Sequence, residues 1–264
     1  MKLTREQVEE YEVEGFLFIK ELFPPDEMSL IRDQIPTVIA DEAVGKVWEE
    51  DGKTLRTLYG IHFTNQIFRN LVRHPRLLQP GQQLFGNDLY VFRSKIVMKP
   101  AFTGGMWGWH QDSAFAQYYE EIPSPKGGNV ILFLDEVNEF NSPVYYIAGS
   151  HKEGILEAAN SSSTTNSSFT LAKETIAKFV DRGGIVAPKG AAGSVLFVHY
   201  DTLHGSVGNI SPFERSNFVI TYSCTEESAL SHKKEKPPYL STSDITPLLP
   251  LSENEVVRLL TNSD

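Results

Sequence analysis

The first part of the chain has the hydrophobic pattern of short helices. Thr4 and Gln7 have the spacing of a capping box, which satisfies the first backbone N–H groups of a helix. The apolar side of the segment that follows is formed by Val8, Tyr11 and Val13. We therefore expect a helix that ends at Gly15, followed by a short strand because residues 16–20 are aromatic and β-branched.

Two further helices are expected in the same region. Pro24 and Pro25 favour a helix start, and apolar residues continue the helical pattern through Ile35. Residues 75–84 predict another helix, which ends near Gly86. The chain up to this point is therefore expected to be helical, with one strand.

After Gly86 the pattern changes to separate β-rich runs with Gly, Pro and Asn between them. These runs cover residues 89–99, 129–134, 144–147, 194–200 and 217–223. Strands that do not alternate with helices argue against a doubly wound sheet, and the sequence contains neither GxGxxG nor GxxxxGK[ST]. The fold class expected is mainly β with flanking helices.

One domain is expected over residues 1–264, made of a helical region 1–86, a β core of about 87–225 and a C-terminal extension 226–264. Residues 158–168, AANSSSTTNSS, are polar and low in complexity, and they predict a surface loop. A loop of this length is either a lid over a site or a plain surface insertion.

The net charge and the cysteine content limit the classes of partner and the kinds of site that the protein can have. A net charge of −10 argues against nucleic acid, because binding to a phosphate backbone needs a basic surface. The single cysteine, Cys224, excludes an intramolecular disulfide and a cysteine-rich zinc site, and it indicates a reducing compartment. The charged first residues predict no signal peptide, and no apolar run reaches the ~18 residues of a membrane span. We therefore expect a cytoplasmic protein that acts on a small molecule.

A metal site is the candidate chemistry. His110 and Asp112 form an HxD triplet, and on an extended segment residues two apart point to the same side. His204, which follows the predicted strand 194–200, is the best candidate for a second imidazole. Two histidines and one carboxylate suit an oxygen-activating iron(II) centre, while zinc with a bound water is the alternative.

Positive charge is expected beside this site. Arg215 lies eleven residues after His204, at the entry to the next strand. If the two residues lie on neighbouring strands, the guanidinium can bind a carboxylate with two parallel hydrogen bonds, and Ser206 can add a hydroxyl donor. This arrangement would suit a dicarboxylate co-substrate.

Other motifs are interpreted as structural or are missing. His151 and Glu153 form a second triplet, HxE, which spacing alone would permit as a metal pair, but it follows a predicted turn at 148–150. His199 is expected on the opposite side of its strand from His204. A serine hydrolase would need GxSxG, and the sequence contains none.

Four motifs resemble one known family. They are EGFLFIKELFPPDEM, WHQD, NSPVYYIAGSHKEG and HGSVGNISPFERSNFVITY, and together they extend over roughly residues 7–225. The chain is similar to the phytanoyl-CoA dioxygenase family of Fe(II)/2-oxoglutarate oxygenases, particularly its bacterial hydroxylases of ectoine and of free amino acids such as leucine. The resemblance implies a double-stranded β-helix (jelly-roll, cupin-like) core with flanking helices.

The resemblance also assigns roles to residues. It implies that His110, Asp112 and His204 bind iron and that Arg215 binds the far carboxylate of 2-oxoglutarate. Further co-substrate contacts are implied for Ser206, Lys95 and Asn129, and substrate contacts for Arg93, Trp109, Phe115 and Tyr118. On the strand before the triplet, Arg93, Lys95, Val97 and Lys99 share one face by alternation.

The substrate is expected to differ from ectoine. Ala116 stands where the ectoine hydroxylases have an aromatic residue, so the pocket has changed. The resemblance implies hydroxylation of an unactivated C–H bond in a small metabolite, preferably a free amino acid, with O2 consumed and succinate and CO2 released. Asp112 favours this reaction over halogenation, since related halogenases have a small residue there. The alternatives are desaturation or epoxidation, tailoring of a larger natural product, a zinc hydrolase and a non-catalytic jelly-roll binding protein.

Overall fold

The computed structural model describes residues 1–114, 117, 126–157, 170–227, 239–240, 244–252 and 254–256. Its helices are α1 (Arg5–Glu14), α2 (Pro25–Arg32), α3 (Ile35–Ala40), α4 (Ile61–Thr64), α5 (Gln66–Leu71), α6 (Pro75–Phe85) and α8 (Lys173–Gly183), with 3-10 turns at Ser150–Glu153 and Thr225–Glu227. Its strands are β1 (Phe16–Ile19), β2 (Gly45–Trp48), β3 (Leu55–Tyr59), β4 (Leu89–Lys99), β5 (Trp107–His110), β6 (Gly127–Phe133), β7 (Tyr145–Ile147), β8 (Ile185–Val186), β9 (Val195–His199), β10 (His204–Ser206) and β11 (Arg215–Cys224).

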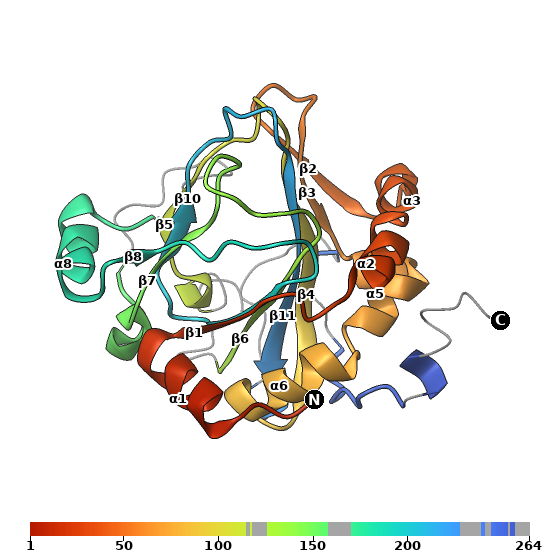
Figure 1. Cartoon of the computed structure of the whole chain (residues 1–264), viewed down its shortest axis with the longest axis horizontal. Coiled ribbons are helices and arrows are strands. Elements are labelled where there is room, and N and C mark those ends of the chain that lie inside the picture. Colours follow the sequence, from red (N-terminus) through yellow and green to blue (C-terminus); the bar gives the residue numbers. More distant parts are fainter. Residues whose placement is uncertain are drawn as a thin grey trace.

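The strands form two antiparallel sheets that face each other. The large sheet has the order β1-β9-β6-β11-β4-β3-β2, and the small sheet has the order β5-β10-β7-β8. Helices α2, α3, α5 and α6 lie along the large sheet on its side away from the small sheet, while α8 lies outside the small sheet (Figure 1). Two facing antiparallel sheets with flanking helices are the architecture of a jelly roll, which confirms the expected fold class.

The N-terminal region follows the sequence pattern closely at its ends. Thr4 and Gln7 form the expected capping box, and Gly15 ends α1 in the left-handed conformation. Val13, however, is 54% exposed, so the apolar side of this helix is narrower than expected. The expected helix through Ile35 is divided into α2 and α3, because Pro36 has no backbone N–H and its ring would clash with the preceding turn.

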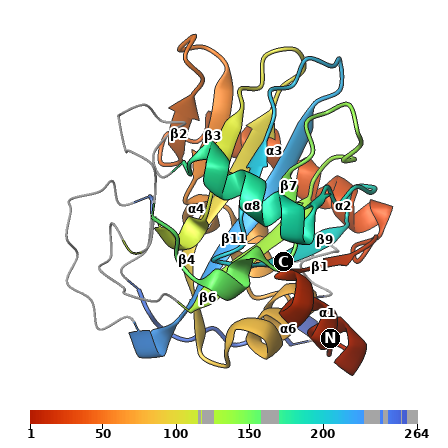
Figure 2. The same ribbon diagram turned by 90° about the vertical axis from the view of Figure 1, so that its left-hand side faces the viewer.

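The expectation of a single strand before residue 86 is wrong. The hairpin of β2 and β3 adds to the edge of the large sheet beside β4 (Figure 2). Both strands are short, and the charged turn between them masks any clear alternation. All five β-rich runs expected after Gly86 are strands, to within a few residues at each end.

The two faces of the large sheet bury different material. Its helix-covered face carries a large apolar cluster that includes Leu132, Phe197, Phe218 and Ile220. Its other face carries a smaller cluster around Phe133 and otherwise borders a cavity. The alternation of side chains along each strand therefore assigns one face to the core and the other to the space between the sheets. No helix among the described residues is long and apolar enough to cross a membrane.

Candidate metal centre and active-site cavity

A cavity of about 410 Å³ lies between the two sheets. The large sheet contributes residues of β2, β3, β4, β6 and β11 to its wall, and the small sheet contributes residues of β5, β7 and β10. The volume is within the range of pockets that enclose small ligands. This position between the sheets brings side chains far apart in sequence into one space.

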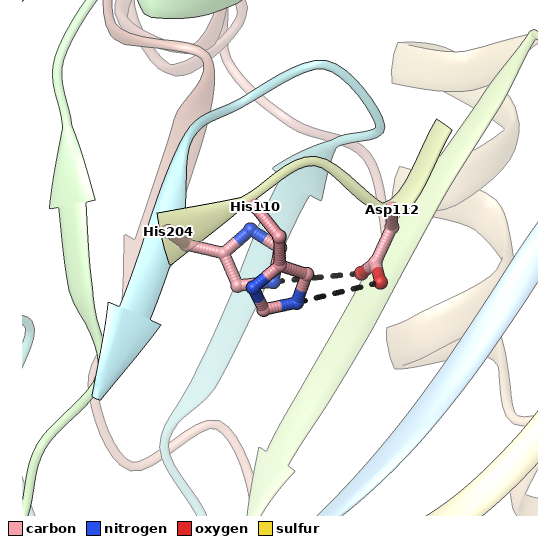
Figure 3. A group of neighbouring side chains, drawn as sticks. All are labelled: His110, Asp112 and His204. Atoms are coloured by element: carbon pink, nitrogen blue, oxygen red, sulfur yellow. Dashed lines mark ion pairs between the residues drawn. The ribbon is translucent and has the colours of Figure 1, made fainter. Parts of the chain in front are cut away.

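His110, Asp112 and His204 form a compact cluster in this cavity. The three side chains point toward one another from the end of β5, the residues after it, and the start of β10 (Figure 3). Their potential ligand atoms all lie within 4.8 Å of one another. The carboxylate lies 3.6 Å from His204 Nε2 and 3.9 Å from His110 Nε2. Asp112 begins a helical turn rather than extending β5, so the convergence does not depend on the strand alternation that we expected.

Backbone carbonyl groups fix the orientation of both imidazoles. His110 Nδ1 lies 2.7 Å from the Gly108 oxygen, and His204 Nδ1 lies 2.9 Å from the Thr202 oxygen. When Nδ1 donates to these carbonyls, Nε2 of the neutral ring keeps its lone pair for a metal ion. Both Nε2 atoms face Asp112, so the tautomers suit a shared cation.

The neighbours of the HxD triplet hold it in place. The Asn129 side-chain amide donates to Asp112 Oδ2, and the Thr221 hydroxyl donates to Asn129 Oδ1 at 2.8 Å. Gln111 points away from the cluster, and its amide nitrogen donates to the backbone oxygens of Gly154 and Asp201 at 2.8 and 2.7 Å. These contacts tie the triplet to both β6 and the loops beyond it, which keeps its geometry fixed before any ligand binds.

Burial and charge prepare the cluster for a cation. Burial, reinforced by the nearby His204, lowers the pKa of His110 to about 4, so its ring is neutral at pH 7. Burial alone would raise the pKa of Asp112, but nearby positive charge, led by Lys95, outweighs it and holds that pKa well below its usual range. The histidine is therefore deprotonated and the carboxylate ionised, the states in which they bind metals.

Arg215 brings positive charge into the same cavity. Its side chain is 1% exposed, and its Nε has no hydrogen-bond partner in the described part of the chain. In the amide orientation that satisfies both ends of Asn217, the side-chain oxygen of that residue accepts from Arg215 Nη1 at 2.7 Å. Burial lowers the pKa of Arg215 to about 10, so it remains charged at neutral pH. A buried guanidinium with a spare donor suits an anionic ligand.

Lys95 and Ser206 also line the cavity, together with Arg93 and Asn129. Burial lowers the pKa of Lys95 to about 8, although Asp112 opposes the shift. The expected alternation along β4 therefore places Arg93, Lys95 and Val97 in the wall. Lys99 is outside it, because its ammonium group donates to the backbone oxygens of Gly105 and Val207 and fixes those loops.

We expected His204 and Arg215 on neighbouring strands, but they lie in different sheets. His204 begins β10 of the small sheet, whereas Arg215 begins β11 of the large sheet. They reach the same cavity because the two sheets face each other. Sequence spacing suggested their proximity correctly, but for a different geometric reason.

Trp109 does not line the cavity, and Trp107 takes that position. The pairing of β5 with β10 shifts register, so that His204 is opposite His110 while Ser206 is opposite Trp107. Strand alternation turns Trp109, the neighbour of His110, away from the cavity, and one extra residue on β5 places Trp107 on the side of His110. The Trp107 ring also stacks on the Arg56 guanidinium, 4.0 Å from the ring centroid.

Several expected residues lie elsewhere or outside the described residues. His151 and His199 pack against each other, with ring centroids 5.2 Å apart, and neither lines the cavity. Phe115, Ala116, Tyr118 and the stretch 158–168 lie outside the described residues.

Besides Trp107, three aromatic residues of the cavity were missed from the sequence. Tyr146 of β7 stacks on His204, with ring centroids 5.7 Å apart, and Tyr59 and Tyr239 form part of the wall. The alternation of the β7 segment could have indicated Tyr146, which lies in the quoted NSPVYYIAGSHKEG motif. Nothing in the sequence signals that Tyr239 reaches the cavity from the C-terminal region.

The donor set fits iron(II). Two imidazoles and one carboxylate converge, with the remaining directions open to the cavity, and no thiolate is near. Zinc would accept the same three atoms, but the buried Arg215 indicates an additional anionic ligand. The fold and site together define the class of non-haem iron oxygenases with a jelly-roll core.

Comparison with known proteins agrees with this class. The family model described as "Phytanoyl-CoA dioxygenase (PhyH)" matches residues 11–217. An ectoine dioxygenase of Streptomyces avermitilis is 30% identical over 93% of this chain and 88% of its own. The L-proline trans-4-hydroxylase of Streptomyces griseoviridis is 28% identical over 93% and 95%.

Solved structures show the same fold. EctD from S. alaskensis, determined with 2-oxoglutarate and 5-hydroxyectoine, has a TM-score of 0.82 at 24% identity over 95% of this chain and 87% of its own. The carbocyclase SnoK from nogalamycin biosynthesis has a TM-score of 0.71 at 18% identity over 94% and 97%.

The chain belongs to the phytanoyl-CoA dioxygenase family. It is an enzyme of the 2-oxoglutarate-dependent dioxygenase class, with iron as its metal and 2-oxoglutarate and O2 as co-substrates.

Proposed function

We propose that this protein hydroxylates an unactivated C–H bond of a small carboxylate-bearing metabolite, with a free amino acid or similar compound as the preferred class. The observation that carries the proposal is the His110, Asp112 and His204 cluster, which shares one cavity with the buried Arg215. Its relatives include an ectoine dioxygenase and a proline hydroxylase, which support a small substrate.

The three cluster residues would hold iron through two Nε2 atoms and one carboxylate oxygen. Iron bound there would supply the chemistry that couples oxidative decarboxylation of 2-oxoglutarate by O2 to oxidation of the substrate. The protein contributes position and exclusion of bulk water rather than an acid or base. Asn129 keeps the carboxylate of Asp112 in place, and the carbonyl groups of Gly108 and Thr202 keep the imidazoles in the binding tautomer.

Arg215 binds the far carboxylate of 2-oxoglutarate. Its orphaned Nε and the Asn217 contact support this role, because a buried guanidinium is costly without an anion. Ser206 adds a hydroxyl on the same side, and Lys95 offers a second positive charge to a carboxylate near the iron. Arg93 extends this positive region along β4.

Hydroxylation is preferred among the possible outcomes. Asp112 would supply the third protein ligand of the metal, so that a halide would have no place among the protein ligands. A tailoring oxygenase of a larger natural product is the second candidate, favoured by the fold likeness to SnoK. We also assign the whole chain to one catalytic domain and the protein to the cytoplasm.

The test is substrate-dependent formation of succinate. Purified protein is incubated with Fe(II), 2-oxoglutarate, O2 and each free amino acid, and products are searched by mass spectrometry for a gain of one oxygen. We expect succinate and an oxygenated product together from at least one amino acid. Succinate without any oxygenated amino acid would direct the search to larger substrates, and no succinate under any condition would refute the proposal.

A further inference from the structure

The strand register divides the cavity into a co-substrate side and a substrate side. Arg215 and Asn217 of β11 lie opposite Lys99 and Val97 of β4, so the co-substrate side follows β11. One strand further, Thr57 of β3 lies opposite Val97. Because neighbouring strands are about 4.8 Å apart, β3 lies roughly 10 Å from β11. The space over β4, β3 and β2 is therefore left for the substrate.

The substrate side, over β4, β3 and β2, has a charged end and a mainly apolar end. Lys95 lies opposite Tyr59, and the Trp107 ring centroid is 6.0 Å from Lys95 Nζ. The wall over β2 and β3 includes Val47 and Tyr59, and Tyr239 and Leu240 add to it from the C-terminal region. Arg56 and Thr57 of β3 also line the cavity, and the Arg56 guanidinium is paired with Glu49 at 2.7 Å. A molecule with a carboxylate and a hydrocarbon body matches this sequence of surfaces.

Tyr239 forms the outer wall from the C-terminal region. It lies beyond residues 11–217, which match the family model, and its ring centroid is 6.4 Å from that of Tyr59. The ring is partly buried and contributes to the cavity lining together with Leu240.

Two glycines make room for this tyrosine. Gly45 starts β2 and is paired with Tyr59, and a Cβ atom at Gly45 would overlap the Tyr239 ring. Gly60 follows β3 with φ +75°, and a Cβ atom there would lie 3.1 Å from the Tyr239 Cβ. At the base of the β2–β3 hairpin, these two glycines therefore leave the space that Tyr239 occupies.

We infer that Tyr239, which packs against Gly45 and Gly60, is a specificity-determining residue that closes the apolar end of the substrate side and limits substrate length. The substrate class is a small carboxylate with a short hydrocarbon body, which rests on the proposed function of the same cavity. We assign the residue no role in iron or co-substrate binding.

The test compares a series of probes of increasing length. Straight-chain L-2-amino acids of four to eight carbons are offered to wild type, Tyr239→Ala and Gly45→Ala. Two readouts are used: oxygenated product with the iron-loaded enzyme, and the thermal shift of protein loaded with Mn(II) and 2-oxoglutarate. Tyr239→Ala should favour the longer probes, with kcat/KM rising about fourfold for each methylene that the opened space buries. Gly45→Ala should displace the ring and change the profile in the same direction.

Two control variants separate specificity from general disturbance. Tyr239→Phe keeps the ring and should therefore keep the wild-type dependence on substrate length. Lys53→Ala shortens an exposed side chain in the turn of the same hairpin and should leave the profile unchanged. The KM for 2-oxoglutarate should stay within twofold of wild type in all four variants.

The outcomes also separate this inference from the proposed function. A changed binding profile in the Mn(II) protein without turnover of any probe supports the role of Tyr239 while it counts against amino acid hydroxylation. Identical length profiles for wild type and Tyr239→Ala in both readouts, including no response at any length, overturn the role of Tyr239.

Discussion

The two faces of the large sheet are built by the same strands but have opposite chemistry. Along β11, Phe218 and Ile220 belong to the apolar cluster under the helices, whereas Arg215 and Asn217 line the cavity. All four residues are buried. The helix-covered face gains free energy by removing apolar surface from water, while the cavity face carries polar groups whose desolvation opposes folding.

This difference shows how the fold can hold an active site without losing its stability. The interdigitated apolar face fixes the strand register, and the register then determines which polar side chains meet on the other side. A change on one face should therefore affect stability, and a change on the other should affect ligand binding. The following experiments test this division.

The largest effect is expected from removing a metal ligand. His204→Ala should abolish 2-oxoglutarate turnover, because only one imidazole and one carboxylate remain to hold iron. The thermal stability of the metal-free protein should be retained. His151→Ala is the matched control, since that histidine is outside the cavity lining, and it should keep its activity. Iron-dependent turnover in His204→Ala at the wild-type rate would refute the assigned cluster.

Neighbouring residues on β11 should separate the two faces most directly. Phe218→Ala removes a fully buried ring from the apolar cluster and should lower the free energy of unfolding by about 3–5 kcal/mol. Val219→Ala, on the cavity side, should cost less stability and should mainly change the KM of the substrate. Denaturant unfolding and steady-state kinetics measure the two effects. Equal stability losses would contradict the division between the faces.

Arg215→Ala should weaken co-substrate binding. Hydrogen bonds to charged groups contribute about 1.5–3 kcal/mol, so the KM for 2-oxoglutarate should rise roughly 10- to 150-fold. Iron affinity, measured by metal titration, should stay close to that of wild type. An unchanged KM would show that another cation, such as Lys95, binds the distal carboxylate.

Asn129→Ala should act through Asp112. Loss of a partner that orients a metal ligand typically reduces metal affinity or activity by about 10- to 100-fold. Thr221→Val removes only the hydroxyl that orients Asn129 and should have a smaller effect in the same direction. Iron titration of both variants checks the order, and a larger loss in Thr221→Val would contradict it.

Acid should destabilise the helix-covered side through His74. Burial, with help from Arg76, lowers the pKa of His74 to about 3, and its Nδ1 accepts from the Arg76 backbone N–H at 3.1 Å. The unfolded chain binds a proton near pH 6.5 and the folded chain does not, so stability falls as the pH decreases from about 6.5 towards 3. The slope for one such group is at most about 1.4 kcal/mol per pH unit.

His74→Asn keeps an acceptor at the start of α6 and removes the titrating group. Unfolding curves between pH 7 and pH 4 should therefore have a shallower pH dependence in this variant. His62, whose pKa burial lowers to about 4, should account for part of the dependence that remains. An unchanged slope would show that His74 does not contribute.

The sequence predicted the regular elements with strong local patterns. The capping box of α1, the long β4 run and the end of α6 at Gly86 are all present, because each depends on nearby residues. It failed for β10, whose residues His204–Ser206 have little β propensity and are extended only because β5 and β7 pair with them. Pairing between distant segments is a tertiary effect that local patterns do not contain.

The candidate site divides in the same way. The HxD triplet and the motif similarity indicated the cluster and Arg215 in advance. Alternation next to His110 already turns Trp109 away, but the place of Trp107 in the wall could not be predicted, because it depends on a bulge in the pairing of β5 with β10. The place of Tyr239 in the cavity could not be predicted either, since it depends on contacts with Gly45 and Gly60, which are far away in sequence.

Cys224, at the end of β11, has a practical consequence. It is the only cysteine of the chain, it is buried, and its thiol donates to the Phe85 carbonyl at 3.1 Å. A thiol in such a setting reacts slowly with alkylating reagents and peroxide. A second cysteine placed at an exposed position such as Val13 could therefore carry a fluorescent or spin label selectively, without replacement of the native residue.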